Sequence, residues 1–329
     1  MSIQNPSDFS EGKGLKSLFC QRFPPQTPSL SASQFQAALS AREHLLAHET
    51  NALRLIDGFA DGFPDIFLEA YADALLLSTR KDSLLTDSLR NELQALDKTV
   101  YWKHLDQNQK TSPTHLYGPE LTEAFPIIEN GVKYRIDFSA GYSQGIFLDQ
   151  RDNRREVMGR ALPGQRILNT FAYTGAFSAA AATSGAITTT LDLSQPYLDW
   201  AKENFQLNGI SPTDHYFCKG DTFHWLNRFR KQGRTFDGII LDPPTFSRDK
   251  QGKVFTVEKD YHTLFALAVS CLAPNGWILA STNCRKLYPD QLMRQLSPSV
   301  PANHELEESP MPEDFSGEQY LKSVWMTPR

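Results

Sequence analysis

The sequence predicts an α/β protein with a mostly parallel sheet, preceded by a small α+β domain. From about residue 139 onward, short apolar segments alternate with long helical stretches, a rhythm typical of right-handed β-α-β crossovers. Before that point, apolar segments follow one another through tight turns. The last two apolar segments have no strong helix between them and predict a terminal antiparallel hairpin. We therefore expect residues 1–50 to form an arm and helix, 51–138 the small domain, and 139–329 the sheet domain.

The first two parts contain two expected helices. Residues 1–30 are rich in Ser, Pro, Gln and Gly and predict an irregular arm. In residues 31–48, apolar side chains recur near one helical face, namely Phe35, Leu39, Leu45 and Leu46. A second helix is expected over 84–96. The expected strands of the small domain are 52–56, 65–71, 74–79, 99–105 and 132–138.

The sheet domain has seven expected strands and two long helices. Residues 195–209 and 257–273 have the length and apolar spacing of helices between parallel strands. The expected strands are 166–171, 186–192, 215–218, 236–242, 277–282, 304–309 and 320–326.

Composition excludes several classes of protein. The net charge of −5 over 329 residues gives no global basic field for nucleic acid, so any RNA binding must be local. Residues 219–259 are locally basic, although such charges are often simply solvated. Four cysteines without CxxC spacing favour a reduced, cytoplasmic setting and no zinc site. No apolar run reaches the roughly 20 residues of a membrane span, and we expect no metal.

The stretch GIILDPPTFSR is the first candidate for a site. Its apolar part predicts a strand covered on both faces, which ends at Asp242. Pro243 and Pro244 then remove two backbone donors and stiffen the loop. Ligands in open α/β sheets bind at the carboxyl ends of strands, so this loop is a candidate site floor. The alternative is a simple proline turn in which Asp242 is a solvated cap.

Three acids follow three successive strands of the sheet domain. Asp192 comes about 20 residues after a loop that contains Gly175, at a place suited to ribose hydroxyls. Asp221 follows the next strand and Asp242 the one after it. NAD would explain Gly175 and Asp192, but its pyrophosphate favours a glycine-rich turn. A cofactor with a cationic centre and no phosphate fits better, and S-adenosylmethionine is such a cofactor.

Four motifs carry a resemblance to a known family: GIFLDQRDNRREV (145–157), ILNTFAYTGAFS, DPPTFSR and QYLKSVW. In order and spacing they resemble bacterial large-subunit (23S) ribosomal RNA methyltransferases that make 5-methylcytosine. They are equally similar to the 7-methylguanine half of the fused rRNA guanine methyltransferase. The resemblance implies a Rossmann-like class I methyltransferase with a seven-stranded sheet, with RNA, and 23S rRNA in particular, as its partner. Residues 51–138 resemble the family's central domain more loosely, and no PUA domain is recognisable.

The resemblance also implies roles for individual residues. In LDQRDNR, Gln150 and Arg151 would close over the cofactor and Arg154 and Arg155 would contact phosphates, although the run could equally be a salt-bridged helix start. Asp221 could equally be a helix cap. The implied cofactor residues are Gln150, Arg151, Asn169, Phe171, Tyr173, Gly175, Asp192, Leu193, Asp221, Thr222 and Asp242. The implied substrate residues are Arg154, Phe246, Arg248, Asn283 and Arg285, with Asp242, Pro243 and Pro244 at the reacting base.

The choice of base depends on the loop STNCRKL. Methylation of cytosine C5 needs a thiolate that first adds to C6, whereas guanine N7 carries an exposed lone pair. The thiol of the cytosine relatives aligns with Asn283, and Cys284 lies one residue later. We therefore favour guanine N7, and Cys284 is catalytic only if cytosine C5 is the target. Two rival functions remain open: a methyltransferase of small molecules or proteins, and a non-catalytic RNA-binding module.

Overall fold

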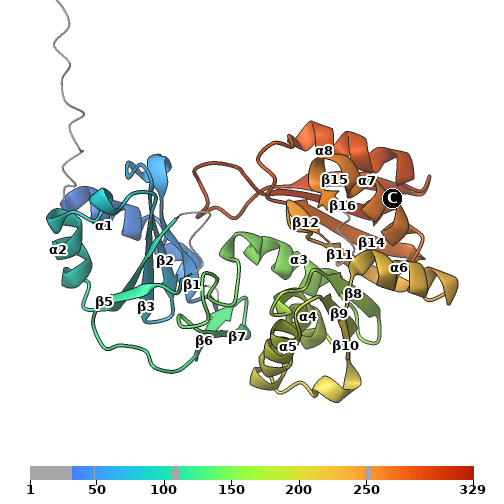
Figure 1. Ribbon diagram of the computed structural model, residues 1–329, viewed down its shortest axis with the longest axis horizontal. Coiled ribbons are helices and arrows are strands. Elements are labelled where there is room, and N and C mark those ends of the chain that lie inside the picture. The colour runs from blue at the N-terminus through green and yellow to red at the C-terminus, as the bar shows by residue number, and fades with distance from the viewer. Residues whose placement is uncertain (1–31, 48, 106–110, 249–253) are drawn as a thin grey trace, which may run out of the picture.

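The computed structural model describes residues 32–47, 49–105, 111–248 and 254–329. Two sheets lie side by side: a five-stranded sheet from the first part of the chain, and a seven-stranded sheet from the second part (Figure 1). Within the described residues, no helix is long and apolar enough to cross a membrane.

The small domain is a five-stranded sheet in chain order, β1 to β5. All neighbours are antiparallel except β3 and β4, which are parallel and joined through α2 (Asp87–Ala95). Apolar side chains of α1 (Ala32–Ser40), α2 and the sheet share one core. The strands are β1 (Ala52–Asp57), β2 (Ile66–Tyr71), β3 (Ala74–Thr79), β4 (Thr99–His104) and β5 (Thr114–Tyr117).

A hairpin of β6 (Phe125–Glu129) and β7 (Val132–Ile136) connects the two sheets. Asn130 and Gly131 at its turn have φ of 51° and 77°, as a tight hairpin turn requires. The backbone of the hairpin bonds Asn51 on one side. On the other side it bonds Asn204 in α5 (Gln195–Leu207) and Asn208 directly after that helix. The boundary near residue 138 therefore follows a hairpin that contacts both parts, and it stays a prediction.

The seven-stranded sheet has the order β10-β9-β8-β11-β14-β16-β15. Its first five strands are parallel, and β16 pairs antiparallel with both β14 and β15. The predicted Rossmann-like sheet with a terminal antiparallel hairpin is confirmed. The strands are β8 (Arg166–Thr170), β9 (Ile187–Asp192), β10 (Tyr216–Lys219), β11 (Phe236–Leu241), β14 (Leu272–Thr282), β15 (His304–Ser309) and β16 (Lys322–Pro328).

Helices cover both faces of this sheet (Figure 1). Side chains of α6, α7 and α8 pack with the strands in one apolar core, and those of α3 and α4 pack in another. This arrangement leaves the carboxyl ends of the parallel strands accessible for a site. The helices are α3 (Arg151–Arg160), α4 (Ala176–Thr183), α5 (Gln195–Leu207), α6 (Thr222–Lys231), α7 (Val257–Val269) and α8 (Pro289–Leu296).

The predicted helix over 31–48 is too long. The helix α1 ends at Ser40, and a 3₁₀ turn (Glu43–Ala47) follows. Between them, the buried Arg42 bonds both oxygens of Asp61 at 2.6 and 2.8 Å, so the tertiary ion pair takes the place of another helical turn. The strands β5 and β6 and the short hairpin of β12 (Phe246–Arg248) and β13 (Val254–Thr256) were not predicted from the sequence.

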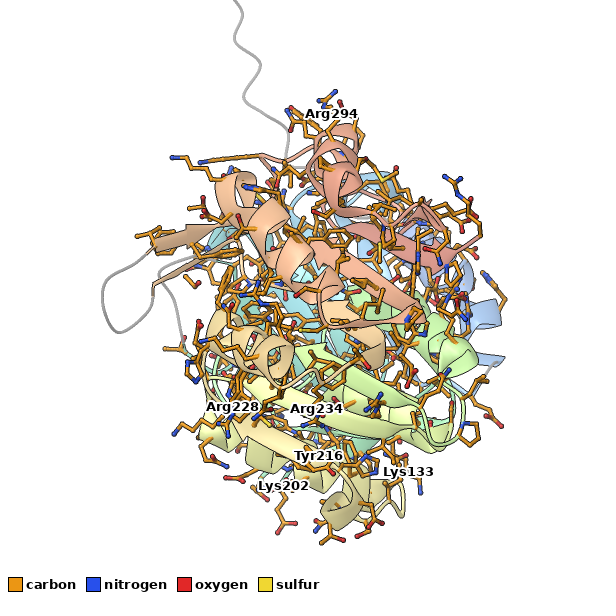
Figure 2. All side chains as sticks on the ribbon, turned by 90° about the vertical axis from the view of Figure 1, so that its right-hand side faces the viewer. Lys133, Lys202, Tyr216, Arg228, Arg234 and Arg294 are labelled. Carbon is orange, nitrogen blue, oxygen red and sulfur yellow. The ribbon has the colours of Figure 1, made fainter. Side chains whose placement is uncertain are left out.

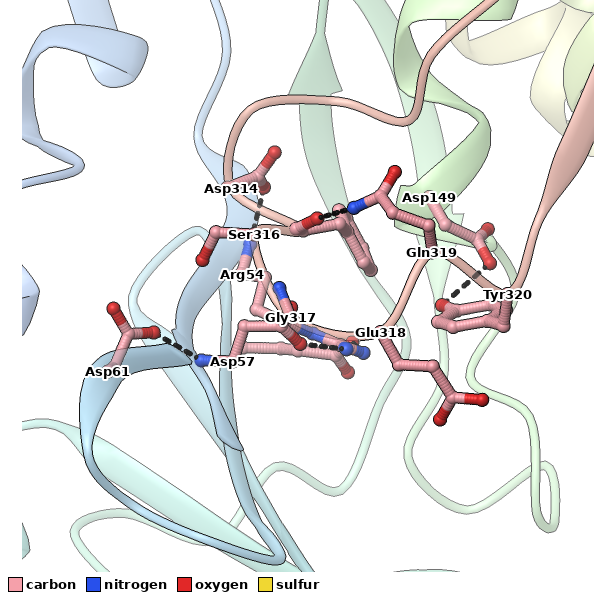
Figure 3. Close-up of polar contacts among 12 residues, drawn as sticks. Arg54, Asp57, Asp61, Asp149, Asp314, Ser316, Gly317, Glu318, Gln319 and Tyr320 are labelled. Carbon is pink, nitrogen blue, oxygen red and sulfur yellow. Dashed lines mark hydrogen bonds and ion pairs between the residues drawn. The ribbon is translucent and has the colours of Figure 1, made fainter. Parts of the chain in front are cut away.

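Residues 310–321, between β15 and β16, cross to the small domain, and we name this segment the strap (Figure 3). Asp314 accepts a hydrogen bond from the backbone N–H of Arg54 in β1 at 2.8 Å. The backbone N–H of Gly317 donates to Asp57 at 2.7 Å. The strap thus fixes the small domain to the edge of the seven-stranded sheet.

Candidate functional site

One large pocket, about 1280 Å³ in volume, lies at the carboxyl ends of the parallel strands. Its size exceeds that of a typical small-ligand pocket, so it has room for a nucleoside cofactor together with part of a substrate. Most of the predicted site residues line it: Gln150, Arg154, Asn169, Phe171, Tyr173, Asp192, Leu193, Asp221, Thr222, Asp242, Pro243, Pro244 and Asn283. Others do not: Arg151, Gly175, Phe246, Cys284 and Arg285.

The loop after β8 has an unusual backbone. Phe171, Tyr173 and Gly175 all have positive φ, of 53°, 51° and 69°. For aromatic residues this conformation costs about 1–3 kcal/mol each, so the surroundings must hold it. The N–H of Tyr173 donates to Asp192 at 2.9 Å, and the hydroxyl of Thr174 donates to the carbonyl of Gly145 at 2.6 Å.

Gly175 has a packing role and does not contact the pocket. A Cβ on this residue would lie 2.6 Å from the Cβ of Ala201 in α5. The glycine is therefore required by its positive φ and by the close approach of α5. Its predicted contact with the cofactor stays a prediction.

Asp192 ends β9 and faces the pocket. Its two oxygens accept hydrogen bonds from the backbone N–H groups of Tyr173 and Ser194, at 2.9 and 2.8 Å. Burial raises the pKa of this carboxyl, and the backbone hydrogen bonds oppose that rise. Each oxygen keeps a second lone pair, which leaves capacity for a ligand with two adjacent hydroxyls.

Asp221 has the capping role that the sequence offered as one alternative, and its predicted contact with the cofactor stays a prediction. It is the N-cap of α6 and accepts a hydrogen bond from the N–H of His224 at 2.8 Å through one oxygen. It also lines the pocket, next to the buried Thr222. The capping role fixes the carboxylate without excluding a ligand contact.

Asp242 lies at the floor of the pocket, before the two prolines. It accepts hydrogen bonds from the hydroxyl of Ser281 at 2.8 Å and from the side-chain amide of Gln150 at 3.1 Å. Burial, and to a smaller extent the charge of Asp149, raises its pKa from 3.8 to about 6. Asn153 in turn holds Gln150 through a 2.6 Å hydrogen bond. The motif LDQRDN therefore positions Asp242 through Gln150.

Asp149 was missed as a site residue, because in the sequence it read only as a counter-charge to neighbouring arginines. It lines the pocket. Its Oδ2 accepts a hydrogen bond from the Tyr320 hydroxyl at 2.9 Å, whereas its Oδ1 is buried without a partner. Burial raises the pKa of this carboxyl. Its position directly before Gln150 was the one available signal.

Arg151 and Arg154 are both held by buried carboxylates. Arg151 makes a two-pronged ion pair with Asp314, at 2.9 and 2.6 Å. Arg154 is only 2% exposed and makes a similar pair with Glu129, at 2.6 and 2.7 Å. These ion pairs give both arginines a structural role, and their predicted contacts with cofactor and phosphate stay predictions. Arg155, in contrast, is exposed and pairs with Asp152, as in a salt-bridged helix start.

In the loop after β14, the neighbouring residues Asn283 and Cys284 lie in different environments. Asn283 lines the pocket, whereas Cys284 is 3% exposed and packs in the core of the sheet. The buried Lys322 fixes this loop by donating to the carbonyl of Cys284 at 2.6 Å. Arg285 is exposed and pairs with Glu318 of the strap.

The aromatic residue of the DPPTFS motif lies at the rim. Phe246 is 55% exposed in β12, and the next residue, Ser247, lines the pocket. Base stacking on Phe246 and phosphate contact by Arg285 stay predictions. The side chain of Arg248 lies outside the described residues. Within the described part of the chain, no group of three or more metal-ligating side chains is placed to hold a metal ion.

Comparison with known proteins shows which family the chain resembles. The family described as S-adenosylmethionine-dependent methyltransferase matches residues 54–323. Ribosomal RNA large subunit methyltransferase K of Neisseria meningitidis is 38% identical over 215 residues, which are 65% of this chain and 57% of that protein. The chain thus spans less than two thirds of that relative.

Two further matches extend over more of the chain. Ribosomal RNA large subunit methyltransferase I of Aeromonas salmonicida is 33% identical over 270 residues, 79% of this chain and 67% of that protein. The crystal structure of SMU.776 complexed with SAH has a TM-score of 0.81 and 31% identity, and the match covers 90% of this chain and 80% of that one.

Proposed function

Since the chain belongs to the family of S-adenosylmethionine-dependent methyltransferases, we propose that it methylates a base of large-subunit ribosomal RNA, with guanine N7 favoured over cytosine C5. Relatives that match most of the chain are named as methyltransferases of this RNA. The choice of base depends on one observation, which is that Cys284 is buried outside the pocket. The pocket is lined instead by Asn283, at the position where the cytosine relatives have their nucleophile.

The pocket fits S-adenosylmethionine, the cofactor of this family. The unused lone pairs of Asp192 suit the ribose hydroxyls, and Asp221 with Thr222 lies where the adenine would bind. Phe171 and Tyr173 would line the methionine part. The cofactor supplies a methyl group on a positively charged sulfur, and the chain's own residues supply position.

A basic and aromatic edge supports RNA as the partner. Arg228 and Arg234 come from the locally basic segment, and Figure 2 shows Arg234 next to Tyr216 in β10, the edge strand of the sheet. The guanidinium of Arg228 lies over the ring of Trp225, 5.0 Å from its centroid. The guanidinium of Arg234 lies over the ring of Tyr216, 5.0 Å from its centroid. Aromatic rings with cations can stack on bases and meet phosphates.

Asp242 and the prolines would orient the base. Asp242 is held by Ser281 and Gln150, and Pro243 and Pro244 line the adjacent wall. A rigid floor of this kind favours in-line displacement, because a misplacement of about 1 Å can reduce a rate about 100-fold. Guanine N7 carries its own lone pair, so no residue needs to add to the base.

Mass spectrometry of rRNA nucleosides from a deletion strain tests the substrate. We expect loss of 7-methylguanine from the large-subunit RNA, restored by the wild-type gene and not by Asp242→Ala. Loss of 5-methylcytosine instead would overturn the choice of base. Unchanged rRNA would favour the rival, a methyltransferase of small molecules or proteins.

A covalent trap tests the base independently. For guanine N7, Cys284→Ser retains most activity and RNA that contains 5-fluorocytosine forms no adduct with the enzyme. A denaturing gel that shows an adduct with the wild type and none with Cys284→Ser would assign cytosine C5 as the target and Cys284 as the nucleophile.

A further inference from the structure

Asp149 and Asp242 form an acidic pair in the pocket. Both line it, and the charge of Asp149 contributes to the raised pKa of Asp242, so the two carboxyls interact. Within the described part of the chain, neither makes an ion pair with Lys, Arg or His. Their hydrogen bonds come from neutral groups only: Tyr320 for Asp149, and Ser281 and Gln150 for Asp242.

Two arginines, Arg54 and Arg154, act on Asp149 through their charge, but each makes its ion pairs with other carboxylates. Arg154 pairs with Glu129 at 2.6 Å. Arg54 pairs with Asp57 at 2.8 Å and with Glu69 at 2.6 Å. These arginines lower the pKa of Asp149 by their charge, but burial outweighs them and the net shift is upward. The acidic pair therefore lies at one end of the pocket without an ion pair to any described side chain.

Asp149 is held in place from outside its own helix. Tyr320, at the end of the strap, points toward Asp149, and the dashed line in Figure 3 marks their 2.9 Å hydrogen bond. The strap is anchored in turn to β1 through Asp314. Only Oδ2 is used, and the buried Oδ1 has no partner. A buried oxygen without a donor is costly, so a carboxylate fixed in this state fits a ligand that brings N–H groups.

We propose that Asp149 binds the α-ammonium group of the cofactor's methionine part, with Asp242 beside the sulfonium. S-adenosylmethionine carries both cations, and an ammonium has three N–H donors for the unused oxygen. The acidic pair thereby recognises the charged end of the cofactor, while Asp192 and Asp221 face its nucleoside end. Neither the motifs nor the matched relatives had assigned Asp149 a role. The inference concerns the cofactor alone, so it stands or fails independently of the RNA substrate.

Calorimetry with four ligands tests this assignment. S-adenosylmethionine, S-adenosylhomocysteine and decarboxylated S-adenosylmethionine all carry the ammonium, whereas 5′-methylthioadenosine lacks the amino-acid part. Asp149→Asn keeps the shape of the side chain and removes its charge. We expect it to raise the Kd of the three ammonium ligands about 10- to 100-fold and to leave that of 5′-methylthioadenosine within about twofold.

Asp152→Asn is the matched control, because Asp152 lies three residues later, at the start of α3 and outside the pocket, and its substitution changes the net charge equally. It should leave all four affinities unchanged. Tyr320→Phe keeps the carboxylate and removes its anchor, so it should weaken the same three ligands to a smaller extent. This variant also covers the case in which Asp149→Asn does not fold.

Three outcomes would overturn the assignment. Equal weakening of all four ligands would mean that Asp149 supports the nucleoside end or the fold. Unchanged affinities with weakened RNA binding would assign the carboxylate to an N–H edge of the base. If Asp149→Asn does not fold and Tyr320→Phe leaves all four affinities unchanged, the ammonium contact is equally excluded.

Discussion

The pocket and the region around the strap are both rich in buried carboxylates, but the partners of these carboxylates differ between the two regions. Around the strap each carboxylate has an arginine: Asp314 has Arg151, Glu69 has Arg54, and Glu129 in the neighbouring hairpin has Arg154. In the pocket, the acids accept only from hydroxyl and amide groups.

The pKa shifts follow this difference. Burial alone would raise the pKa of Glu69, but the charge of Arg54 reverses the effect and the pKa is lowered. The pKa values of Asp149, Asp192 and Asp242 are raised by burial. Paired acids therefore hold the fold together, whereas the unpaired acids of the pocket make the ligand-free protein less stable and are available to a cationic or hydroxyl-bearing ligand.

The largest expected effect comes from breaking a buried pair. Glu129→Ala leaves the fully buried Arg154 without its partner and should lower the free energy of unfolding by about 3–5 kcal/mol. Denaturant unfolding measures this. The exposed pair of Asp290 and Arg294 is the control, since Asp290→Ala should cost less than about 1 kcal/mol. If both variants lowered the free energy of unfolding by the same small amount, the distinction between paired and unpaired buried acids would be contradicted.

Next in size is the loss of activity in Asp242→Ala. The variant removes the group that Gln150 and Ser281 hold at the pocket floor, and its rate should fall about 100-fold. The free energy of unfolding should not fall with it. Single-turnover methylation of RNA and thermal unfolding on the same preparation check both statements, and a stable variant with full activity would remove Asp242 from the reaction.

Asp192→Ala should weaken the binding of S-adenosylmethionine by about 1–3 kcal/mol, because the ribose hydroxyls lose a buried acceptor. Calorimetry decides this, provided that the variant is folded, since Asp192 also holds the strained loop at Tyr173. Tight binding of NAD by the wild type, or unchanged affinity in the variant, would reject the ribose assignment.

The smallest effect is a pH-dependent gain in stability. The pKa of Asp242 in the folded protein is raised from 3.8 to about 6, so its ionised form destabilises the ligand-free fold. Its favourable contribution is present below the unfolded pKa and is lost as the pH rises through about 6. Asp242→Asn should therefore be more stable than the wild type above pH 6, by at most about 3 kcal/mol before the weaker hydrogen bonds of the amide are subtracted, and the difference should shrink toward pH 4. Unfolding curves at several pH values test the sign.

The sequence predicted the large sheet well because its information is local. Each strand is a short apolar run next to a helix of suitable length, and the acids Asp192, Asp221 and Asp242 follow their strands directly. Topology then brings strand ends together without further information. The segment of β7 was predicted as a strand. Its partner β6 was not, although Asn130-Gly131 is a strong turn signal, and it contains Pro126, a residue uncommon inside strands.

What the sequence did not predict has a different cause. The buried ion pairs of Arg151 and Arg154 were not predicted, because their carboxylate partners lie 163 and 25 residues away in the chain, where no spacing rule applies. Asp149 was overlooked for the reverse reason, because its neighbours in the sequence are arginines that pair elsewhere in space. The prediction that 31–48 forms one helix failed at Arg42, whose partner Asp61 is 19 residues away.

The strap also affects the order in which the chain can be completed during synthesis. The partners that Arg54 and Asp57 find in Asp314 and Gly317 are made 260 residues later. At roughly 5–20 residues per second this is a delay of about 13–52 seconds. During that time the polar groups of β1 must be satisfied by water or by other proteins. The small domain is therefore made first and completed last, and the interval is the period in which it is most exposed to proteases and chaperones.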